Sequence, residues 1–257
     1  MNALDESFAE KVRSGRKLLV PFVTAGFPTR EATPAIVRAL AAAGADAVEI
    51  GIPFSDPLAD GPVIQRSSKQ ALANGVTLAW ALDMAGSIGS SVPLVVMGYV
   101  NPLERFGVER FAEACARSGI AGVIVPDLPL DEADELRAAL VENRIHYVPL
   151  AAPTTTAKRL ARLGSAATAF LYCVSVAGTT GARELPKDLE QFLARARKAT
   201  ERPRLVGFGI SDAASAKRAA AASEGVIVGS ALIEAIGGAA DPADAARRFL
   251  EPLRAAL

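Results

Sequence analysis

Two carboxylates stand out in the string EIGIPFSDPLADGP, residues 49–62, because of the places they occupy. Glu49 interrupts a run of apolar residues typical of a buried strand, near the end of that run. Burial disfavours the charged form of a carboxylate, so we expect a raised pKa in the range useful for acid–base catalysis. Asp60 ends the following loop, just before Pro62, and an N-cap or turn role fits this residue equally well.

Glycine-rich segments indicate a second kind of chemistry, the binding of a phosphate. Gly209 follows one apolar run, and Gly229-Ser230 follows the next, before an expected helix over Ala231–Ile236. Glycine lets backbone N–H groups approach an anion, and the N-terminus of a helix adds a favourable dipole. No GxGxxG or Walker spacing accompanies these glycines. The small residues of Ser175–Arg183 are typical either of a lid over a ligand or of a plain surface loop.

The rest of the composition excludes several kinds of site. With one histidine, His146, and two cysteines, Cys115 and Cys173, the chain lacks the ligands of a multi-histidine metal centre and the cysteines of a disulfide framework. None of its lysines follows an apolar run, so a Schiff-base nucleophile is missing. Equal numbers of cationic and anionic residues, 28 of each, argue against non-specific binding of nucleic acid.

The N-terminus predicts no export signal. Residues 1–15 form a charged amphipathic segment without the apolar core of a signal peptide. Charged residues interrupt every long apolar run before it reaches the roughly 20 residues of a membrane span. We therefore expect a cytoplasmic protein that does not enter a membrane.

Apolar runs alternate with helical patterns along the whole chain and predict the fold class. The runs begin near residues 18, 47, 93, 122, 146, 169, 204 and 225. The predicted helices are Glu31–Ala43, Pro62–Asn74, Thr77–Ser87, Val108–Arg117, Asp131–Asn143, Thr156–Leu163, Pro186–Ala199 and Ala213–Ala222. Eight strands, each followed by a helix, are the count of a (β/α)8 TIM barrel, in which the loops after the strands carry the chemistry. An open doubly wound sheet is the alternative, since alternation alone does not close a barrel.

We expect one α/β domain over residues 1–257, with an extra N-terminal helix and extra helices in the loops, because no linker divides the chain. In such a barrel His146 would begin the fifth strand, at the end away from the chemistry. A structural role is therefore expected for it.

Six strings in this order resemble the tryptophan synthase α subunit family: PFVTAGFPT, EIGIPFSDPLADGPVIQ, GVIVPDLP, YCVSVAGTTGAR, VGFGIS and VGSAL. The second is highly specific to that family, and together the strings span essentially the whole chain. The resemblance implies a TIM barrel and the retro-aldol cleavage of indole-3-glycerol phosphate to indole and glyceraldehyde 3-phosphate, a lyase step of tryptophan biosynthesis. A stand-alone lyase that releases free indole is the alternative enzyme, and a non-catalytic scaffold is the alternative of another class.

The resemblance also implies the site residues. Glu49 and Asp60 match the catalytic carboxylates. The phosphate contacts match Gly181, Gly209, Gly229 and Ser230, and the lining of the indole pocket matches Phe22, Met97, Tyr172 and Phe208. No metal and no cofactor are implied for this chain.

A partner is implied as well. It is a tryptophan synthase β subunit that carries pyridoxal phosphate and receives indole in an α2β2 tetramer. The loop Pro53–Asp60 and the segment Tyr99–Pro102 match the contact region, and Asp56 is expected to touch the partner.

Overall fold

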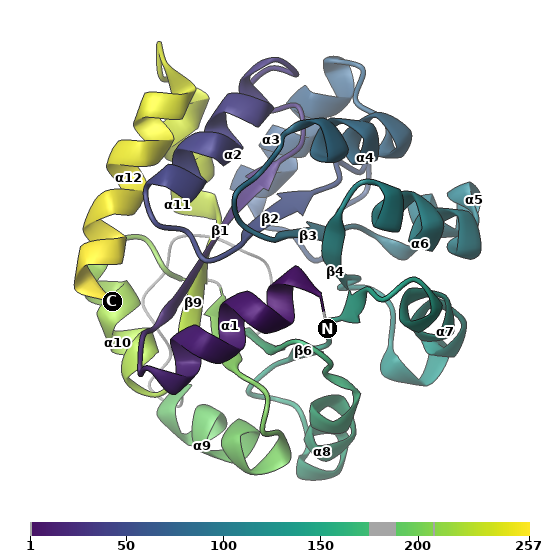
Figure 1. The fold of residues 1–257 in the computed structure, drawn as a ribbon, viewed down its shortest axis with the longest axis vertical. Helices are drawn as coiled ribbons and strands as arrows, with labels where there is room; N and C mark the ends of the chain where they lie inside the picture. Colours follow the sequence, from purple (N-terminus) through teal and green to yellow (C-terminus); the bar gives the residue numbers. More distant parts are fainter. Residues whose placement is uncertain (1, 175–188, 208) are drawn as a thin grey trace.

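The computed structural model describes residues 2–174, 189–207 and 209–257, and its strands form one parallel sheet in the order β5-β4-β3-β2-β1-β9-β8-β7-β6 (Figure 1). The strands are β1 (Leu18–Thr24), β2 (Val48–Gly51), β3 (Leu94–Met97), β4 (Ile120–Ile124), β5 (His146–Tyr147), β6 (Leu150–Ala151), β7 (Leu171–Val174), β8 (Arg204–Gly207) and β9 (Gly225–Val228). Each lies in one of the eight predicted runs, except that β4 begins two residues before its run, and β5 and β6 share the fifth.

The sheet closes on itself at β5 and β6, which stand at the two ends of its strand order but only two residues apart. The Val148 N–H donates to the Val123 carbonyl at 3.0 Å, and the Pro149 carbonyl accepts from the Tyr172 N–H at 3.0 Å. Hydrogen bonding therefore continues from β4 to β7 through one bent strand. Pro149 has no N–H to donate to a neighbouring strand, so the regular pairing is interrupted there and the fifth strand is divided into β5 and β6. The predicted barrel is confirmed, and the open-sheet alternative is wrong.

Helices surround the barrel and connect successive strands (Figure 1). They are α1 (Ala3–Arg13), α2 (Ala32–Ala42), α3 (Pro62–Ala73), α4 (Leu78–Ser87), α5 (Val100–Phe106), α6 (Val108–Arg117), η1 (Leu130–Glu132), α7 (Asp134–Glu142), α8 (Ala157–Ala166), α9 (Leu189–Ala199), α10 (Ala213–Ala221), α11 (Ser230–Gly237) and α12 (Pro242–Ala256). The predicted helix over Asp131–Asn143 is wrong at its start, where a 3₁₀ turn precedes α7. Helices α5 and α12 had no counterpart in the sequence analysis.

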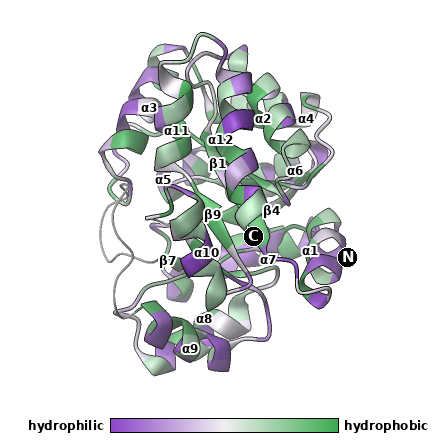
Figure 2. Cartoon of the chain, turned by 90° about the vertical axis from the view of Figure 1, so that its left-hand side faces the viewer, coloured by the Kyte–Doolittle hydropathy of each residue, from purple (hydrophilic) through white to green (hydrophobic). Residues whose placement is uncertain are grey.

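Two apolar layers hold the fold together. The inner layer fills the barrel with side chains such as Val20, Val95, Phe170 and Tyr172, and the outer layer lies between the strands and the helices. Both faces of the strands are thus buried, as expected for a parallel sheet. Figure 2 shows the strands green and hydrophobic inside, while the surrounding helices mix green with purple.

Helix α1 covers the end of the barrel at which the strands begin (Figures 1 and 2). Its Leu4 and Phe8 are buried in the inner layer, and the Phe8 ring lies 5.9 Å from that of Phe170. Asp5 of α1 approaches the ring of His146, with 3.0 Å between Oδ2 and Nε2. His146 therefore lies at the covered end of the barrel in contact with α1, as expected for a structural residue.

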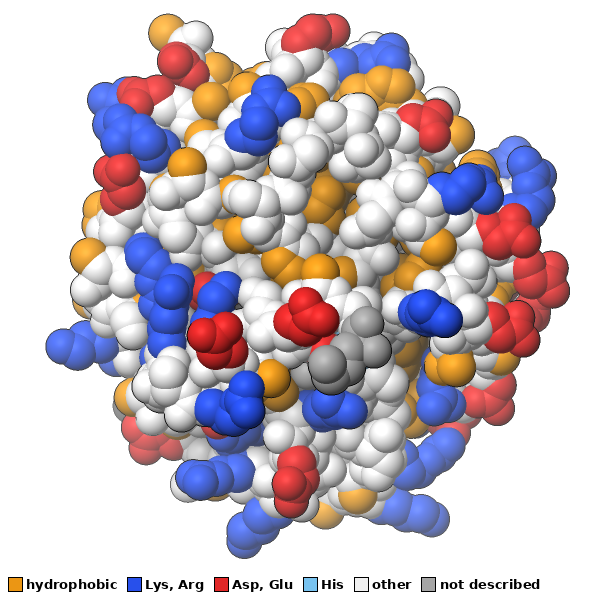
Figure 3. Space-filling model, in the orientation of Figure 1, with side chains coloured by type: hydrophobic (Ala, Val, Ile, Leu, Met, Phe, Trp, Pro, Cys, Tyr) orange, Lys and Arg blue, Asp and Glu red, His pale blue; other side chains and the backbone are white. Residues whose placement is uncertain are grey.

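A buried carboxylate, Asp46, ties this end of the barrel to both ends of the chain. It is fully buried and lies 3.0 Å from the Lys11 ammonium, 3.1 Å from the Arg16 guanidinium and 2.9 Å from that of Arg254. The Leu19 N–H also donates to it, at 2.8 Å. Figure 3 shows acidic and basic side chains mixed over this face of the molecule.

Candidate active site

Glu49 extends from β2 into the barrel and is only 1% exposed. The register places it beside Phe22 of β1 and Val95 of β3, so its immediate strand neighbours are apolar. Burial, and secondarily the charge of Asp60, raises the pKa of Glu49 to about 8. Its Oε2 atom is buried with no hydrogen-bond partner among the described residues. A carboxyl of this kind holds a proton at neutral pH and has an oxygen free to deliver it.

Asp60 lies in the loop that joins β2 to α3 and is 4% exposed. The N-cap of α3 is Gly61, so Asp60 does not cap that helix through its side chain. Burial raises the pKa of Asp60 to about 6, and a hydrogen bond from Tyr99 opposes that rise. Asp60 is therefore largely ionised at pH 7, whereas Glu49 is protonated.

Aromatic side chains lie against the two carboxylates. Tyr172 of β7 is 4% exposed, and its pKa is raised by burial and then by the charges of Glu49 and Asp60, which places it near both. The Phe22 ring covers Gly51 so closely that a Cβ there would lie 2.4 Å from a ring atom. Glycine at position 51 thus makes room for the ring. Met97 ends β3 beside Gly51 and Ile124 and contacts the inner layer.

The predicted phosphate residues that the structure describes follow β8 and β9, two adjacent strands. Gly209 has a φ of +77°, a backbone conformation that favours glycine. Gly229 is the N-cap of α11, and no side chain caps this helix. A Cβ on Gly229 would lie 3.5 Å from Phe22, so this helix N-terminus stands beside the barrel mouth. Ser230 is the first residue of α11.

Two predicted contacts, Gly181 and Phe208, lie outside the described residues, and so does the segment from residue 175 to 183. The structure therefore does not test them.

The two segments predicted to contact a partner lie together. A groove of about 490 Å³ is lined by Pro53 and Phe54 from the loop after β2 and by Asn101 and Pro102 from α5. In the same loop Leu58 is 86% exposed. Two segments that are far apart in the sequence thus line one groove, and one of them is the loop that carries Asp60.

Tyr99 was predicted only as part of the partner-contact segment, but it also lies at the carboxylates. Tyr99 is 3% exposed, and its hydroxyl accepts a hydrogen bond from the Ala59 N–H at 3.0 Å. A tyrosine directly after the apolar run LVVMG, where a strand ends at the mouth of a barrel, is the signal that could have identified it.

The arrangement defines a class of protein: a (β/α)8-barrel enzyme with a protonated and an ionised carboxyl group buried together. Neighbouring carboxyl groups whose pKa values are pushed apart are typical of acid–base catalysis. The described residues contain no cluster of three or more His, Cys, Asp or Glu side chains that could hold a metal ion. No helix within the described ranges is long and apolar enough to cross a membrane.

Comparison with known proteins identifies the family. The model of the tryptophan synthase alpha chain family matches residues 8–255. The tryptophan synthase alpha chain of Xylella fastidiosa is 48% identical over 264 residues, which cover 100% of this chain and 98% of the relative. That of Xanthomonas oryzae is 47% identical and covers 100% and 99%. The alpha subunit structure from Legionella pneumophila superposes with a TM-score of 0.93 at 36% identity, covering 100% of this chain and 98% of that one.

A structure of Mycobacterium tuberculosis tryptophan synthase gives a TM-score of 0.92 at 35% identity and covers 99% and 98% of the two chains. The chain belongs to the tryptophan synthase alpha chain family. It is a lyase of tryptophan biosynthesis, and the alpha reaction is the cleavage of indole-3-glycerol phosphate to indole and glyceraldehyde 3-phosphate. Membership of the family also implies a β-subunit partner.

Proposed function

We propose that this chain performs the alpha reaction with Glu49 and Asp60 as its two catalytic residues. The observation that carries the proposal is the pair of buried carboxyl groups, of which one has its pKa raised to about 8 and the other to about 6. At neutral pH the first can donate a proton and the second carries a negative charge. A retro-aldol cleavage in which indole leaves needs both properties.

Glu49 is the proton shuttle. Its carboxyl donates a proton to C3 of the indole ring, which makes the ring a cation. Its carboxylate then removes the proton from the glycerol hydroxyl next to the bond that breaks. The C–O bond becomes a carbonyl, the C–C bond breaks, and its electron pair returns to the indole ring. One proton is given and one is taken, so Glu49 ends the cycle in its starting state.

Asp60 stabilises the positive charge that appears on the ring. As an ionised carboxylate it accepts a hydrogen bond from the indole N–H, and this bond strengthens as the ring becomes cationic. A buried site makes such an interaction stronger than it would be in water. Because the indole ring itself accepts the electron pair, the reaction needs no cofactor on this chain.

The remaining site residues would hold the substrate. Phe22, Met97 and Tyr172 supply an apolar lining beside the carboxylates, and Phe208 is proposed to join them. Gly209, Gly229 and Ser230 would offer backbone N–H groups and the α11 dipole to the phosphate, together with Gly181. Inorganic phosphate or glycerol phosphate should therefore compete with the substrate.

The test of the catalytic assignment is Glu49→Gln, assayed by indole release from indole-3-glycerol phosphate. We expect turnover to fall ~10²–10⁴-fold, the usual contribution of positioned proton transfer, while glycerol phosphate still binds. A surface control, Glu142→Gln in α7, should keep full activity. Near-normal kcat in Glu49→Gln would remove this residue from the mechanism.

We further propose that a β subunit docks on the groove formed by the loop after β2 and α5, giving an α2β2 tetramer in the cytoplasm. Pyridoxal phosphate would be bound by that partner. Docking would order the loop that carries Asp60, and so raise kcat more than it lowers KM. Titration of a β subunit against wild type and Asp56→Ala tests this. The variant should lose the activation by the partner but keep the activity of the chain without it. A chain that is fast by itself and insensitive to the partner would instead be a stand-alone lyase.

A further inference from the structure

The placement of Asp60 depends on a loop with little internal support. Between β2 and α3, the loop has two short-range backbone hydrogen bonds, from Leu58 N–H to the Asp56 carbonyl at 2.9 Å and from Asp60 N–H to the Pro57 carbonyl at 3.0 Å. Leu58 itself is largely exposed. A catalytic carboxylate on such a loop is only as well placed as the contacts that fix the loop from outside.

Gln65 of α3 supplies one such contact, its Nε2 donating to the Asp60 carbonyl at 2.9 Å, and Tyr99, two residues after β3, supplies further ones. Its ring stacks on Phe54 at the start of the loop, with 5.3 Å between ring centroids and 29° between planes. Its hydroxyl accepts the Ala59 N–H at 3.0 Å, at the end of the loop. A tyrosine hydroxyl has one proton to donate, and it goes to the carboxylate of Asp60. One buried side chain thus fixes both ends of the loop and the carboxylate.

Tyr99 is held in turn by the next loop around the barrel. It is the N-cap of α5, but its side chain does not cap the helix. Asp127, which follows β4, accepts the N–H of Val100, the first residue of α5, at 2.9 Å. This carboxylate satisfies a donor at the helix N-terminus and lies favourably to its dipole. The loops after β2, β3 and β4 are therefore connected in series through Asp60, Tyr99 and Asp127.

We propose that Tyr99 is a positioning residue for Asp60 and that Asp127 positions Tyr99 by fixing the start of α5. The inference rests on the proposed role of Asp60 in catalysis. Tyr99 aims the carboxylate and keeps it ionised, since a hydrogen bond to the charged form lowers the pKa of Asp60. The titratable groups that face Asp60 among the described residues are Glu49, Tyr99 and Tyr172.

Tyr99→Phe keeps the ring stack and removes only the hydroxyl. We expect kcat to fall ~10–100-fold with little change in KM, because a small misplacement of a catalytic group is that costly. The acidic limb of the pH–rate profile should move to higher pH, because Asp60 loses the hydrogen bond that favours its charged form. The matched control is Tyr147→Phe, which deletes a hydroxyl from another tyrosine that is 4% exposed, and which should change neither quantity.

Asp127 is tested by a pair of variants. An asparagine side chain also offers an oxygen to the Val100 N–H, so Asp127→Asn should stay near wild type, whereas Asp127→Ala should lower kcat as Tyr99→Phe does. This pair keeps the inference testable if Tyr99→Phe folds poorly. Equal activity of Asp127→Ala and Asp127→Asn would remove Asp127 from the inference.

Asp60→Asn separates this inference from the function on which it rests. If Asp60→Asn is fully active, the catalytic role of Asp60 is wrong. If Asp60→Asn is inactive while Tyr99→Phe keeps both the kcat and the pH profile of wild type, the positioning role of Tyr99 is wrong. In support, the loss caused by Tyr99→Phe should disappear when Asp60→Asn is already present, as expected for coupled residues.

Discussion

Replacing Glu49 by glutamine should stabilise the protein as well as inactivate it. The carboxyl has a pKa of about 8 in the folded chain and 4.5 as its ordinary value, so folding favours the protonated form. Between these values the unfolded chain releases a proton that the folded chain keeps, and stability falls as the pH rises. Glutamine has nearly the same shape and no proton to lose, so it escapes this penalty.

The magnitude follows from the two pKa values. A tenfold difference in proton affinity corresponds to about 1.4 kcal/mol, so the penalty at pH 9 is on the order of 5 kcal/mol, and at pH 7 about 3 kcal/mol. Below pH 4.5 it vanishes, because both states of the chain are then protonated. The advantage of Glu49→Gln over wild type should therefore grow across the window from pH 4.5 to 8.

Urea unfolding followed by circular dichroism, at intervals from pH 5 to pH 9, measures this difference. The contribution of Asp60 is present in both proteins and largely cancels. Glu142→Gln, an exposed position on α7, should follow wild type at every pH. If the stabilities of Glu49→Gln and wild type differed by a constant amount across the range, the buried carboxyl would not hold its proton as argued.

Three other outcomes are expected. The pH–rate profile should be bell-shaped, rising near pH 6 as Asp60 ionises and falling near pH 8 as Glu49 loses its proton. Steady-state kinetics of indole release measure the profile, and a flat one would contradict this expectation. Asp46→Asn should cost roughly 1–3 kcal/mol of unfolding free energy, because the three partly solvent-exposed cations lose their buried counter-charge, while the activity per folded molecule stays unchanged. Gly164→Ala should destabilise by roughly 1–3 kcal/mol, since its Cβ would lie 2.1 Å from the Ala199 carbonyl oxygen, and denaturant titration checks this.

The sequence was informative wherever a local pattern decides the structure. Apolar runs buried on both faces are distinctive, so every strand begins within a few residues of the start of its predicted run. The burial of Glu49 was predictable for the same reason, since its neighbours along the strand are apolar. The catalytic roles of Glu49 and Asp60 remain predictions, because burial and pKa describe a site without showing its reaction.

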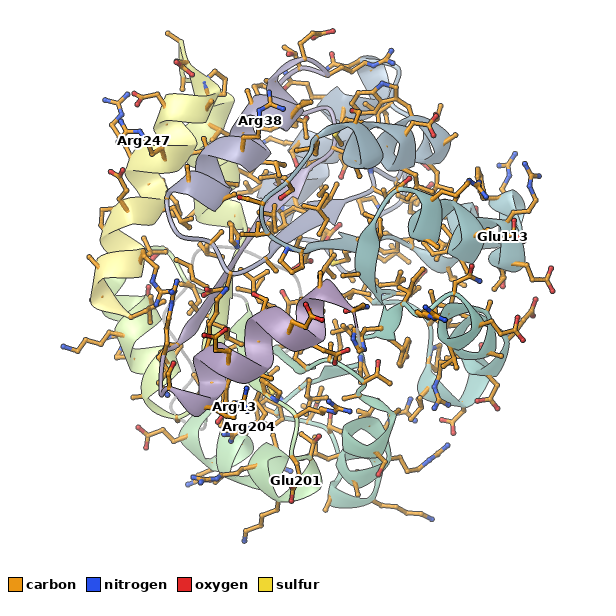
Figure 4. All side chains as sticks on the ribbon, in the orientation of Figure 1. Arg13, Arg38, Glu113, Glu201, Arg204 and Arg247 are labelled. Carbon is orange, nitrogen blue, oxygen red and sulfur yellow. The ribbon has the colours of Figure 1, made fainter. Side chains whose placement is uncertain are left out.

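Contacts between distant segments were beyond such patterns. Tyr99 reaches Asp60 only because the barrel sets the ends of β2 and β3 side by side, so its hydrogen bond to Ala59 has no local signature. The break in the fifth strand at Pro149 required the register with both neighbouring strands. Arg204, labelled in Figure 4, has no local signature either: its guanidinium pairs with Glu224, twenty residues further along the chain.

Asp46, just before β2, and Glu49, within β2, show how one short segment serves both stability and chemistry. The two carboxylates are three residues apart and almost fully buried. Asp46, at the covered end of the barrel, meets three cations and a backbone N–H, and it joins α1 to α12. Glu49, toward the mouth, meets apolar side chains and keeps one oxygen without a partner. A buried carboxylate supplied with donors is a structural link, whereas one deprived of them is an acid that holds its proton for a substrate. Both residues are carboxylates, so their roles differ because hydrogen-bond donors and cations surround Asp46 at the covered end of the barrel and are missing around Glu49 Oε2 toward the mouth.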